Sequence, residues 1–199
     1  MADSCGTAFI DANVFVHSWT TDVMLSFADT GLFEPLWSEA VLDEAREALI
    51  GMRPQAEVQI RSYIDAVKRS NRYACVPEAE FAADVPELPD PDDRHVAAAA
   101  AGGGAKWIVT YNLKDFPAGA LAPMGLEPIA PDTFLCMLFE HDSALAAATM
   151  RGLVADKRRP PRTMAEEIAG LRKSGLGGFA DTLDALLASS GEAAERRDY

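Results

Sequence analysis

The chain has 199 residues, 49% of them hydrophobic and 25% charged, and its formal net charge at pH 7 is −13. This composition is typical of a globular protein that buries a sizeable core, and it excludes an intrinsically disordered chain. The negative charge argues against a protein that coats nucleic acids regardless of sequence, because an acidic surface repels phosphates at long range.

Most of the acidic charge lies in the first part of the chain. Residues 1–139 contain 9 basic and 21 acidic residues, whereas residues 140–199 contain 9 and 10. No basic segment precedes the first apolar residues and no apolar run approaches the ~20 residues that cross a bilayer, so we expect a cytoplasmic protein with no membrane partner. The cysteines form no CxxC pair and the histidines no zinc motif, which predicts reduced thiols.

Strands and helices alternate along the first half of the chain. Short apolar runs predict the strands. The helices are predicted by N-cap residues, among them Ser38 and Asp90, by Pro in the first turn and by Gly after the last turn. In chain order the predicted elements are strand 7–10, helix 22–30, strand 33–37, helix 39–50, helix 54–70 with Val58 on its buried face, strand 73–76, helix 91–101 and strand 106–111. Strands joined by helices indicate an α/β fold with a mainly parallel sheet.

From Pro131 onward the pattern predicts helices alone. Their expected signals are Asp132 as an N-cap, Ser143 as the start of an alanine-rich helix, a capping box of Thr163 and Glu166, a last helix at 179–188 and a fraying GEAAERRDY terminus. We therefore divide the chain into an α/β domain, residues 1–139, and a small helical C-terminal extension, residues 140–199.

Polar side chains follow two of the predicted strands. Asp11 comes directly after strand 7–10, and Asn112 and Asp115 follow strand 106–111. Because ligands collect beyond the carboxyl ends of parallel strands, we expect these side chains to converge there.

Helix geometry places two further acids near the core. On a helical wheel Glu44 lies at the edge of the apolar arc of helix 39–50, whereas the other acids of that helix point away from the arc. Asp93 precedes Val96 and Ala97 by three and four residues, which places it on the face that packs against the sheet. An unpaired carboxylate in such a position is costly, so each acid requires a cation or several donors.

Converging carboxylates repel one another, and divalent cations relieve that repulsion. Hard oxygen ligands suit Mg²⁺ or Mn²⁺, so the constellation predicts a site for one or two such ions. Taken singly, each acid also has an ordinary explanation: Asp11 as a turn residue, Glu44 as a solvated helix residue, Asp93 as an acid at a helix N-terminus, and Asp115 as a loop acid.

The ordered motifs FIDANVFV, LDEAREAL, DPDDRHVAAAA and IVTYNLKDFP resemble those of the PIN-domain nucleases, and especially the VapC-type toxins of bacterial toxin–antitoxin pairs. The resemblance covers roughly residues 7–140, and the tail resembles the extension of longer members of the group. It implies a PIN-like α/β/α sandwich with a mainly parallel central sheet, a Mg²⁺- or Mn²⁺-dependent endoribonuclease, an RNA substrate such as tRNA or rRNA, a VapB-like antitoxin partner and a homodimer.

The resemblance also implies roles for individual residues. It assigns catalysis and metal ligation to Asp11, Glu44, Asp93 and Asp115, and it adds Asn112, which stands where many relatives carry Asp, as a direct or water-mediated metal contact. The implied reaction is in-line attack of a metal-activated water on an RNA phosphodiester, which leaves 3′-hydroxyl and 5′-phosphate ends, with Glu44 or Asp115 assisting proton transfer. We expect Asp11→Asn or Asp93→Asn to leave the metal-free protein at least as stable as the wild type.

Neighbours of these acids have supporting roles. Asn13 and Thr110 are expected to orient the carboxylates through hydrogen bonds, with ordinary turn chemistry as the alternative. Arg94 is a candidate contact for a substrate phosphate, or else a solvated helix cation. His95 is expected to be a packed helix residue without a catalytic part. The candidate RNA-binding clusters, each alternatively a solvated helix end, are Lys68, Arg69 and Arg72, and Lys157, Arg158, Arg159 and Arg162.

Two other functions remain open. A haloacid-dehalogenase-like phosphohydrolase also carries Asp at the end of its first strand, but Asn13 stands where its second acid would be. A PIN-fold protein that binds partners and cleaves nothing would keep the fold, although the presence of all four acids argues against it. Metal binding and RNA cleavage distinguish these possibilities.

Overall fold

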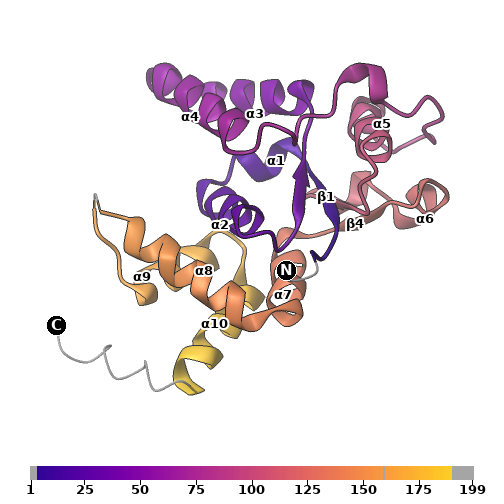
Figure 1. Ribbon diagram of the computed structural model, residues 1–199. Coiled ribbons are helices and arrows are strands. Elements are labelled where there is room, and N and C mark those ends of the chain that lie inside the picture. Colours follow the sequence, from indigo (N-terminus) through magenta and orange to yellow (C-terminus); the bar gives the residue numbers. More distant parts are fainter. Residues whose placement is uncertain (1–3, 159, 190–199) are drawn as a thin grey trace.

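The computed structural model describes residues 4–158 and 160–189, and a four-stranded parallel sheet in the order β2-β1-β3-β4 forms its centre (Figure 1). The strands are β1 (Thr7–Ile10), β2 (Glu34–Leu36), β3 (Trp107–Val109) and β4 (Glu127–Ile129). Ala8 of β1 aligns with Pro35 on one side and with Trp107 on the other, so β1 and β3 are the inner strands. Both consist of buried apolar residues at their centres, as expected for strands covered on two faces.

The strand predictions at 7–10, 33–37 and 106–111 are confirmed in position, although β2 and β3 are shorter than predicted. The strand predicted at 73–76 is wrong, because this segment makes a single bridge, Trp37 to Cys75, beyond the end of β2. β4 was not predicted. Its central residue is Pro128, which argues against a strand in sequence but is tolerated here because β4 is an edge strand.

The helices of the α/β part are α1 (Ala12–Phe15), α2 (Ser18–Asp29), α3 (Glu39–Met52), α4 (Glu57–Ser70), α5 (Arg94–Gly102) and α6 (Ala118–Leu121). Short 3-10 turns occur at 54–56, 78–80, 91–93, 113–115 and 122–124. The N-caps Ser38 and Asp90 are confirmed, since their side chains accept from the amides of Val41 and Asp92.

Three details of these helices differ from the predictions. α2 begins at Ser18, four residues earlier than predicted, and its Thr21 can be buried because its hydroxyl donates to the Val14 carbonyl at 3.1 Å. α3 does not stop at Gly51 but continues to Met52. In α4, Val58 is 74% exposed, and the buried face is formed by Ile60, Ile64 and Val67 instead.

The C-terminal helices are α7 (Pro131–His141), α8 (Ser143–Asp156), α9 (Met164–Lys173) and α10 (Gly177–Ser189). The start at Ser143 and the Thr163–Glu166 capping box are confirmed. The cap assigned to Asp132 is wrong. α7 begins at Pro131, and the Asp132 carboxylate instead accepts from the amides of Gly178 at 2.9 Å and Phe179 at 2.8 Å, at the start of α10. The GEAAERRDY terminus lies outside the described residues.

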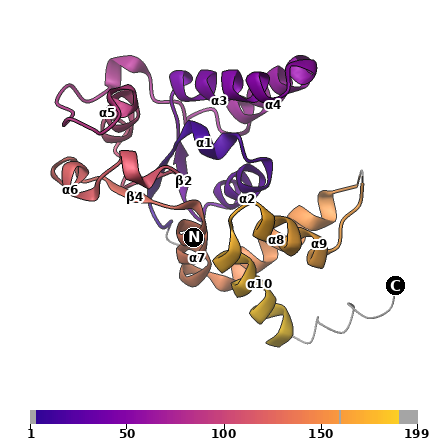
Figure 2. The same cartoon turned by 180° about the vertical axis from the view of Figure 1, so that it is seen from behind.

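Helices cover the sheet in a PIN-like α/β/α arrangement. α2 lies on one side of the sheet, and α5 and α6 lie on the other, in the front view and from behind (Figures 1 and 2). α8, α9 and α10 gather below the α/β part, where α8 and α9 contact α2 and α10 contacts α7 (Figure 1). None of the described helices is long and apolar enough to cross a membrane.

One hydrophobic core runs through both parts of the chain. It extends from Ala8 to Leu187, and the rings of Phe27 in α2 and Phe179 in α10 meet edge to face at 5.7 Å. The boundary predicted between residues 139 and 140 falls inside α7. The division of the chain into two domains therefore stays a prediction, which the cooperativity of unfolding can test.

Candidate metal-dependent active site

The order of the strands indicates where a ligand site should lie. From β1 the chain passes through α1 and α2 to β2 on one side, and it later returns to β3 on the other side of β1. Such a switch point leaves a crevice beyond the carboxyl ends of the two inner strands. Asp11 follows β1 at this place, as the sequence predicted, and Thr110, which was predicted to lie within the strand, directly follows the shorter β3.

Asp11 is buried and held by three donors. Its side chain is 5% exposed, and its carboxylate accepts from the Ala12 amide, the Asn13 side-chain amide and the Thr110 hydroxyl, each at 2.6 Å. Burial raises the pKa of Asp11, and the bonds from Thr110 and Ala12 lower it. The carboxylate is thereby fixed in orientation and partly stabilised in its charged form.

Asn13 and Thr110 join α1 to the end of β3. The Asn13 side-chain nitrogen donates to the Thr110 hydroxyl at 2.9 Å, and its oxygen accepts from the Tyr111 amide at 3.1 Å. The Thr110 hydroxyl also accepts from the Asn112 amide at 2.9 Å. Thr110 thus uses its one proton on Asp11 and both lone pairs on neighbours, so the predicted orienting contacts of Asn13 and Thr110 are present in the structure.

Asp93 differs from an ordinary acid at a helix start. It precedes α5 as the N-cap residue, yet its side chain makes no cap hydrogen bond within the described part of the chain. Its Oδ2 atom is buried and has no partner among these residues. Burial, followed by the charges of Asp11, Asp90 and Asp115, raises the pKa of Asp93 to about 6. A carboxylate under this repulsion, with an oxygen free to accept, is suited to receive a cation.

Glu44 reaches the site from α3 through His95. The Glu44 side chain is 49% exposed, so it is not directed toward the core as the helical wheel suggested, and its Oε1 lies 2.8 Å from Nε2 of His95. The hydrogen bond that His95 donates to the Glu44 carboxylate raises the pKa of His95, and the charges of Asp93 and Asp11 act in the same direction. His95 therefore does more than pack against its neighbours, which corrects the sequence-based interpretation. No spacing within the sequence relates α3 to α5, so this pair could not be found from sequence.

The raised pKa of His95 can be measured. In an NMR titration of the His95 ring protons, we expect Glu44→Gln to lower the pKa of His95, and Glu47→Gln, an exposed acid of the same helix, to leave it unchanged. Since a raised histidine pKa stabilises the fold below about pH 6.5, this contribution disappears as the pH rises through the folded-state pKa. Equal His95 titrations in the wild type and Glu44→Gln would show that the pair does not form in solution.

Asp115 and Asn112 complete the set. The side-chain amide of Asn112 donates to Oδ2 of Asp115, and Lys114 Nζ lies 3.9 Å from the same oxygen. The Asp115 side chain is only 15% exposed, and its charge contributes to the raised pKa of Asp93.

The acids suit a divalent ion in their donor chemistry but do not yet enclose one. Among residues 4–158 and 160–189, no three Asp, Glu, His or Cys side chains lie close enough together to hold an ion as they stand. Two of the four acids are engaged elsewhere, Glu44 with His95 and Asp115 with Asn112. Hard oxygen donors and the unpartnered Oδ2 of Asp93 fit Mg²⁺ or Mn²⁺. Binding would therefore require these side chains to turn toward Asp11 and Asp93.

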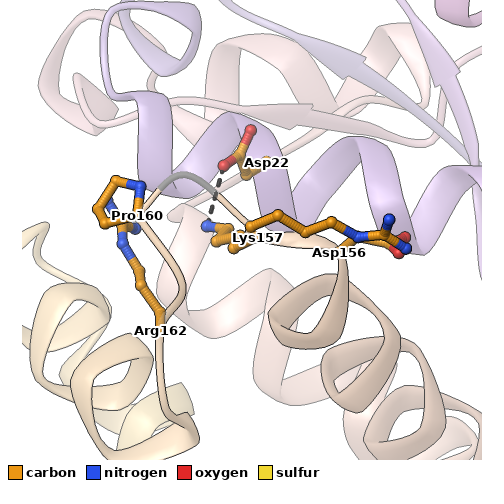
Figure 3. A pocket seen from close by; sticks show the side chains of 6 residues that line it. Asp22, Asp156, Lys157, Pro160 and Arg162 are labelled. Carbon is orange, nitrogen blue, oxygen red and sulfur yellow. Dashed lines mark hydrogen bonds and ion pairs between the residues drawn. The ribbon is translucent and has the colours of Figure 1, made fainter.

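The cations predicted to meet RNA are largely used within the fold. Arg94 donates to the Val85 carbonyl at 2.8 Å, and Lys68 pairs with Glu39, so their contact with phosphates stays a prediction. A hollow of about 480 Å³, lined by Lys157, Arg158 and Arg162 but also by acids, lies in the C-terminal part and not at the carboxylates (Figure 3). Arg159 lies outside the described residues.

Comparison with known proteins identifies the family. The PIN domain family model matches residues 7–114, which is more than half of the chain and contains three of the four acids. The chain belongs to the PIN-domain family. A second model, the VapC50 C-terminal domain, matches residues 131–185 of this PIN protein, which corresponds to α7 through most of α10. The resemblance to VapC-type PIN proteins with a C-terminal extension is thus confirmed, and a haloacid-dehalogenase-like protein is excluded.

One curated relative supports the same assignment. The PIN protein is 41% identical over 71 residues to a protein of Mycobacterium tuberculosis (strain ATCC 25618 / H37Rv) named "Putative ribonuclease VapC50". The match covers 36% of this chain and 42% of the relative, so it spans less than half the length of either protein. No solved structure matches this chain.

Proposed function

We propose that this PIN protein is a Mg²⁺- or Mn²⁺-dependent endoribonuclease and the toxin of a VapBC-type toxin–antitoxin pair. The observation that carries the proposal is the position of Asp93, whose buried and unpartnered oxygen lies in the field of Asp11 and Asp115. A fold has no need to place a carboxylate among other carboxylates that raise its pKa, whereas a divalent ion requires such a group. Family membership and the name of the relative support the same chemistry.

Asp11 and Asp93 would be the principal ligands, with Asp115, Glu44 and Asn112 as further contacts. The bound ion would supply activation of a water molecule and neutralisation of phosphate charge. Asp11 needs no reorientation for this task, because Ala12, Asn13 and Thr110 already fix it.

Other residues would orient the substrate and move the proton. Glu44 and Asp115 are not the principal ligands, so either could accept a proton from the attacking water as the RNA phosphodiester is cleaved in line. His95, hydrogen-bonded to Glu44 at 2.8 Å, would hold that carboxylate in place until metal and RNA arrive. Arg94 and Lys114 are the nearest cations in sequence to the third and fourth acids and are candidate contacts for the phosphates beside the cleaved bond.

Partners follow from the same proposal. A VapB-like antitoxin would block the site in the resting cell, the active form would be a homodimer, and the substrate would be a tRNA or rRNA. A folded RNA suits this protein better than an extended one, because the basic side chains form local clusters on a chain of net charge −13.

The proposal is tested by incubating purified protein with total bacterial RNA in Mg²⁺, in Mn²⁺ and in EDTA. We expect discrete fragments with 3′-hydroxyl and 5′-phosphate ends in both metals and intact RNA in EDTA. Intact RNA in all three, together with no uptake of Mn²⁺ in a calorimetric titration, would favour a PIN protein that only binds partners.

A further inference from the structure

Tyr111 connects the C-terminal helices to the candidate active site. It lies between Thr110, which donates to Asp11, and Asn112, which donates to Asp115, and its own amide donates to Asn13. Its hydroxyl donates to the Ser174 carbonyl at 3.1 Å and lies 2.7 Å from the Thr20 hydroxyl. Since the tyrosine has one proton and gives it to Ser174, Thr20 is the donor in the second contact.

The Tyr111 hydroxyl caps the C-terminal end of α9 at Ser174. Ser174 is the C-cap of α9, where carbonyl groups lack partners within the helix, and the Tyr111 hydroxyl satisfies its carbonyl. The chain then turns at Gly175 with φ +82°, and a Cβ atom there would lie 3.7 Å from the Tyr111 ring. The Tyr111 ring also packs against the ring of His17, with the two centroids 4.7 Å apart. Tyr111 is therefore held by both parts of the chain.

α9 is itself fastened to α2, next to Thr20. Lys157 and Arg162 place their cations 4.9 Å and 4.1 Å from the ring of Trp19, and both pair with Glu167, which is fully buried in α9. Figure 3 shows Lys157 also reaching Asp22 of α2, at 3.1 Å. These contacts join α9 to α2. Tyr111 bonds to Ser174 at the end of α9 and to Thr20 in α2.

The approach of the two helices is close at Gly170. A Cβ atom at this position would come within 2.2 Å of the Trp19 ring, so any side chain there must displace that ring or move α9 away from α2. A substitution at Gly170 contacts none of the four acids, but it disturbs the contact between α9 and α2, beside which Tyr111 bonds to Ser174. It therefore offers a way to disturb the site from a distance.

We propose that Tyr111 is a positioning residue through which the C-terminal helices hold Asp11 and Asp115 in their working arrangement. This inference rests on the proposed function, because it assigns the C-terminal extension a part in the same site. Tyr111 does not touch the reacting atoms. It acts through Thr110, Asn13 and Asn112, which orient the acids.

The full-length protein is compared as wild type, Tyr111→Phe, Gly170→Ala and Gly152→Ala. Gly152 is the matched control, because it is exposed on α8 and a Cβ atom there meets nothing within 4 Å. For Tyr111→Phe and Gly170→Ala we expect about tenfold weaker Mn²⁺ binding by calorimetry and about tenfold lower kcat for RNA cleavage, with KM changed by less than about twofold. Gly152→Ala should match the wild type in all three quantities.

Thr20 gives an independent variant pair should Gly170→Ala not fold. Thr20→Ser keeps the hydroxyl that donates to Tyr111 and should retain Mn²⁺ affinity and kcat, whereas Thr20→Val should weaken Mn²⁺ binding and lower kcat by up to about tenfold. Folded Tyr111→Phe with the Mn²⁺ affinity and kcat of an active wild type would overturn the positioning role and leave the proposed function intact. A wild type that neither binds Mn²⁺ nor cuts RNA would overturn the proposed function, and this inference with it.

Discussion

Asp93→Asn should abolish RNA cleavage while making the metal-free protein more stable. We expect the cleavage rate to fall at least about 100-fold, because the variant removes a predicted metal ligand. At pH 7 we expect a gain of about 1 kcal/mol in the free energy of unfolding, since the pKa of about 6 reflects burial and, after it, repulsion by neighbouring acids, and a neutral amide relieves both. The partial exposure of Asp93 keeps this gain small.

The pH dependence of that gain follows from the sign of the shift. The folded-state pKa of Asp93 is raised, so the wild type keeps its full stability below about pH 4 and loses part of it as the pH rises through about 6. Wild type and Asp93→Asn should therefore coincide in urea unfolding near pH 4 and diverge by pH 7. Added Mg²⁺ should reverse the difference, because it stabilises only the protein that binds it.

Two controls sharpen this experiment. Asp92→Asn changes the exposed neighbour and should leave cleavage and stability unchanged. Asp11→Asn should also abolish cleavage, but it should cost about 1 kcal/mol or more in stability, because an amide nitrogen would face donors that now bond to a carboxylate. This departs from the sequence-based expectation of equal or greater stability. A stability loss in Asp93→Asn at pH 7 would show that this acid serves the fold.

Phe179→Ala should destabilise the whole protein and not the C-terminal helices alone. Phe179 is fully buried and its ring contacts Phe27 of α2 and Phe139 of α7. Deleting such a ring costs about 3–5 kcal/mol, which corresponds to a drop in Tm on the order of 10 °C. Because one core spans both parts, we expect a single calorimetric transition before and after the change.

Tyr73→Ala is the matched aromatic deletion, since Tyr73 is 95% exposed and should cost less than about 0.5 kcal/mol. Two separate transitions, of which Phe179→Ala shifts only one, would contradict this expectation. They would support the predicted division into two independently stable domains near residue 140.

The sequence predicted the features that depend on local pattern. Asp11 and Asp115 could be placed because the apolar runs before them mark parallel strands, whose carboxyl ends meet. The capping signals at Ser38, Asp90 and Thr163 were confirmed for the same reason, since each acts on amides two or three residues away.

The features that were missed depend on contacts between distant segments. β4 was missed because Pro128 at its centre argues against a strand, and proline is acceptable there only because β4 lies at the edge of the sheet. The 73–76 segment has the composition of a strand but finds one bridging partner. The bond between Glu44 and His95 joins a residue of α3 to one of α5, about fifty residues further along the chain, and neither helical pattern encodes that contact.

Asp132 of α7 and the start of α10 depend on each other, so a transferable segment must contain both. The Asp132 carboxylate satisfies the first amides of α10 from α7, and a Cβ atom on Gly178 would lie 2.9 Å from Oδ2, so the two positions constrain each other. A recombinant or evolutionary module cut at Ser143 would leave α10 without its cap, at a cost of about 1 kcal/mol. A module cut at Pro131 carries its own cap to a new host, and the match of the VapC50 C-terminal domain begins at residue 131.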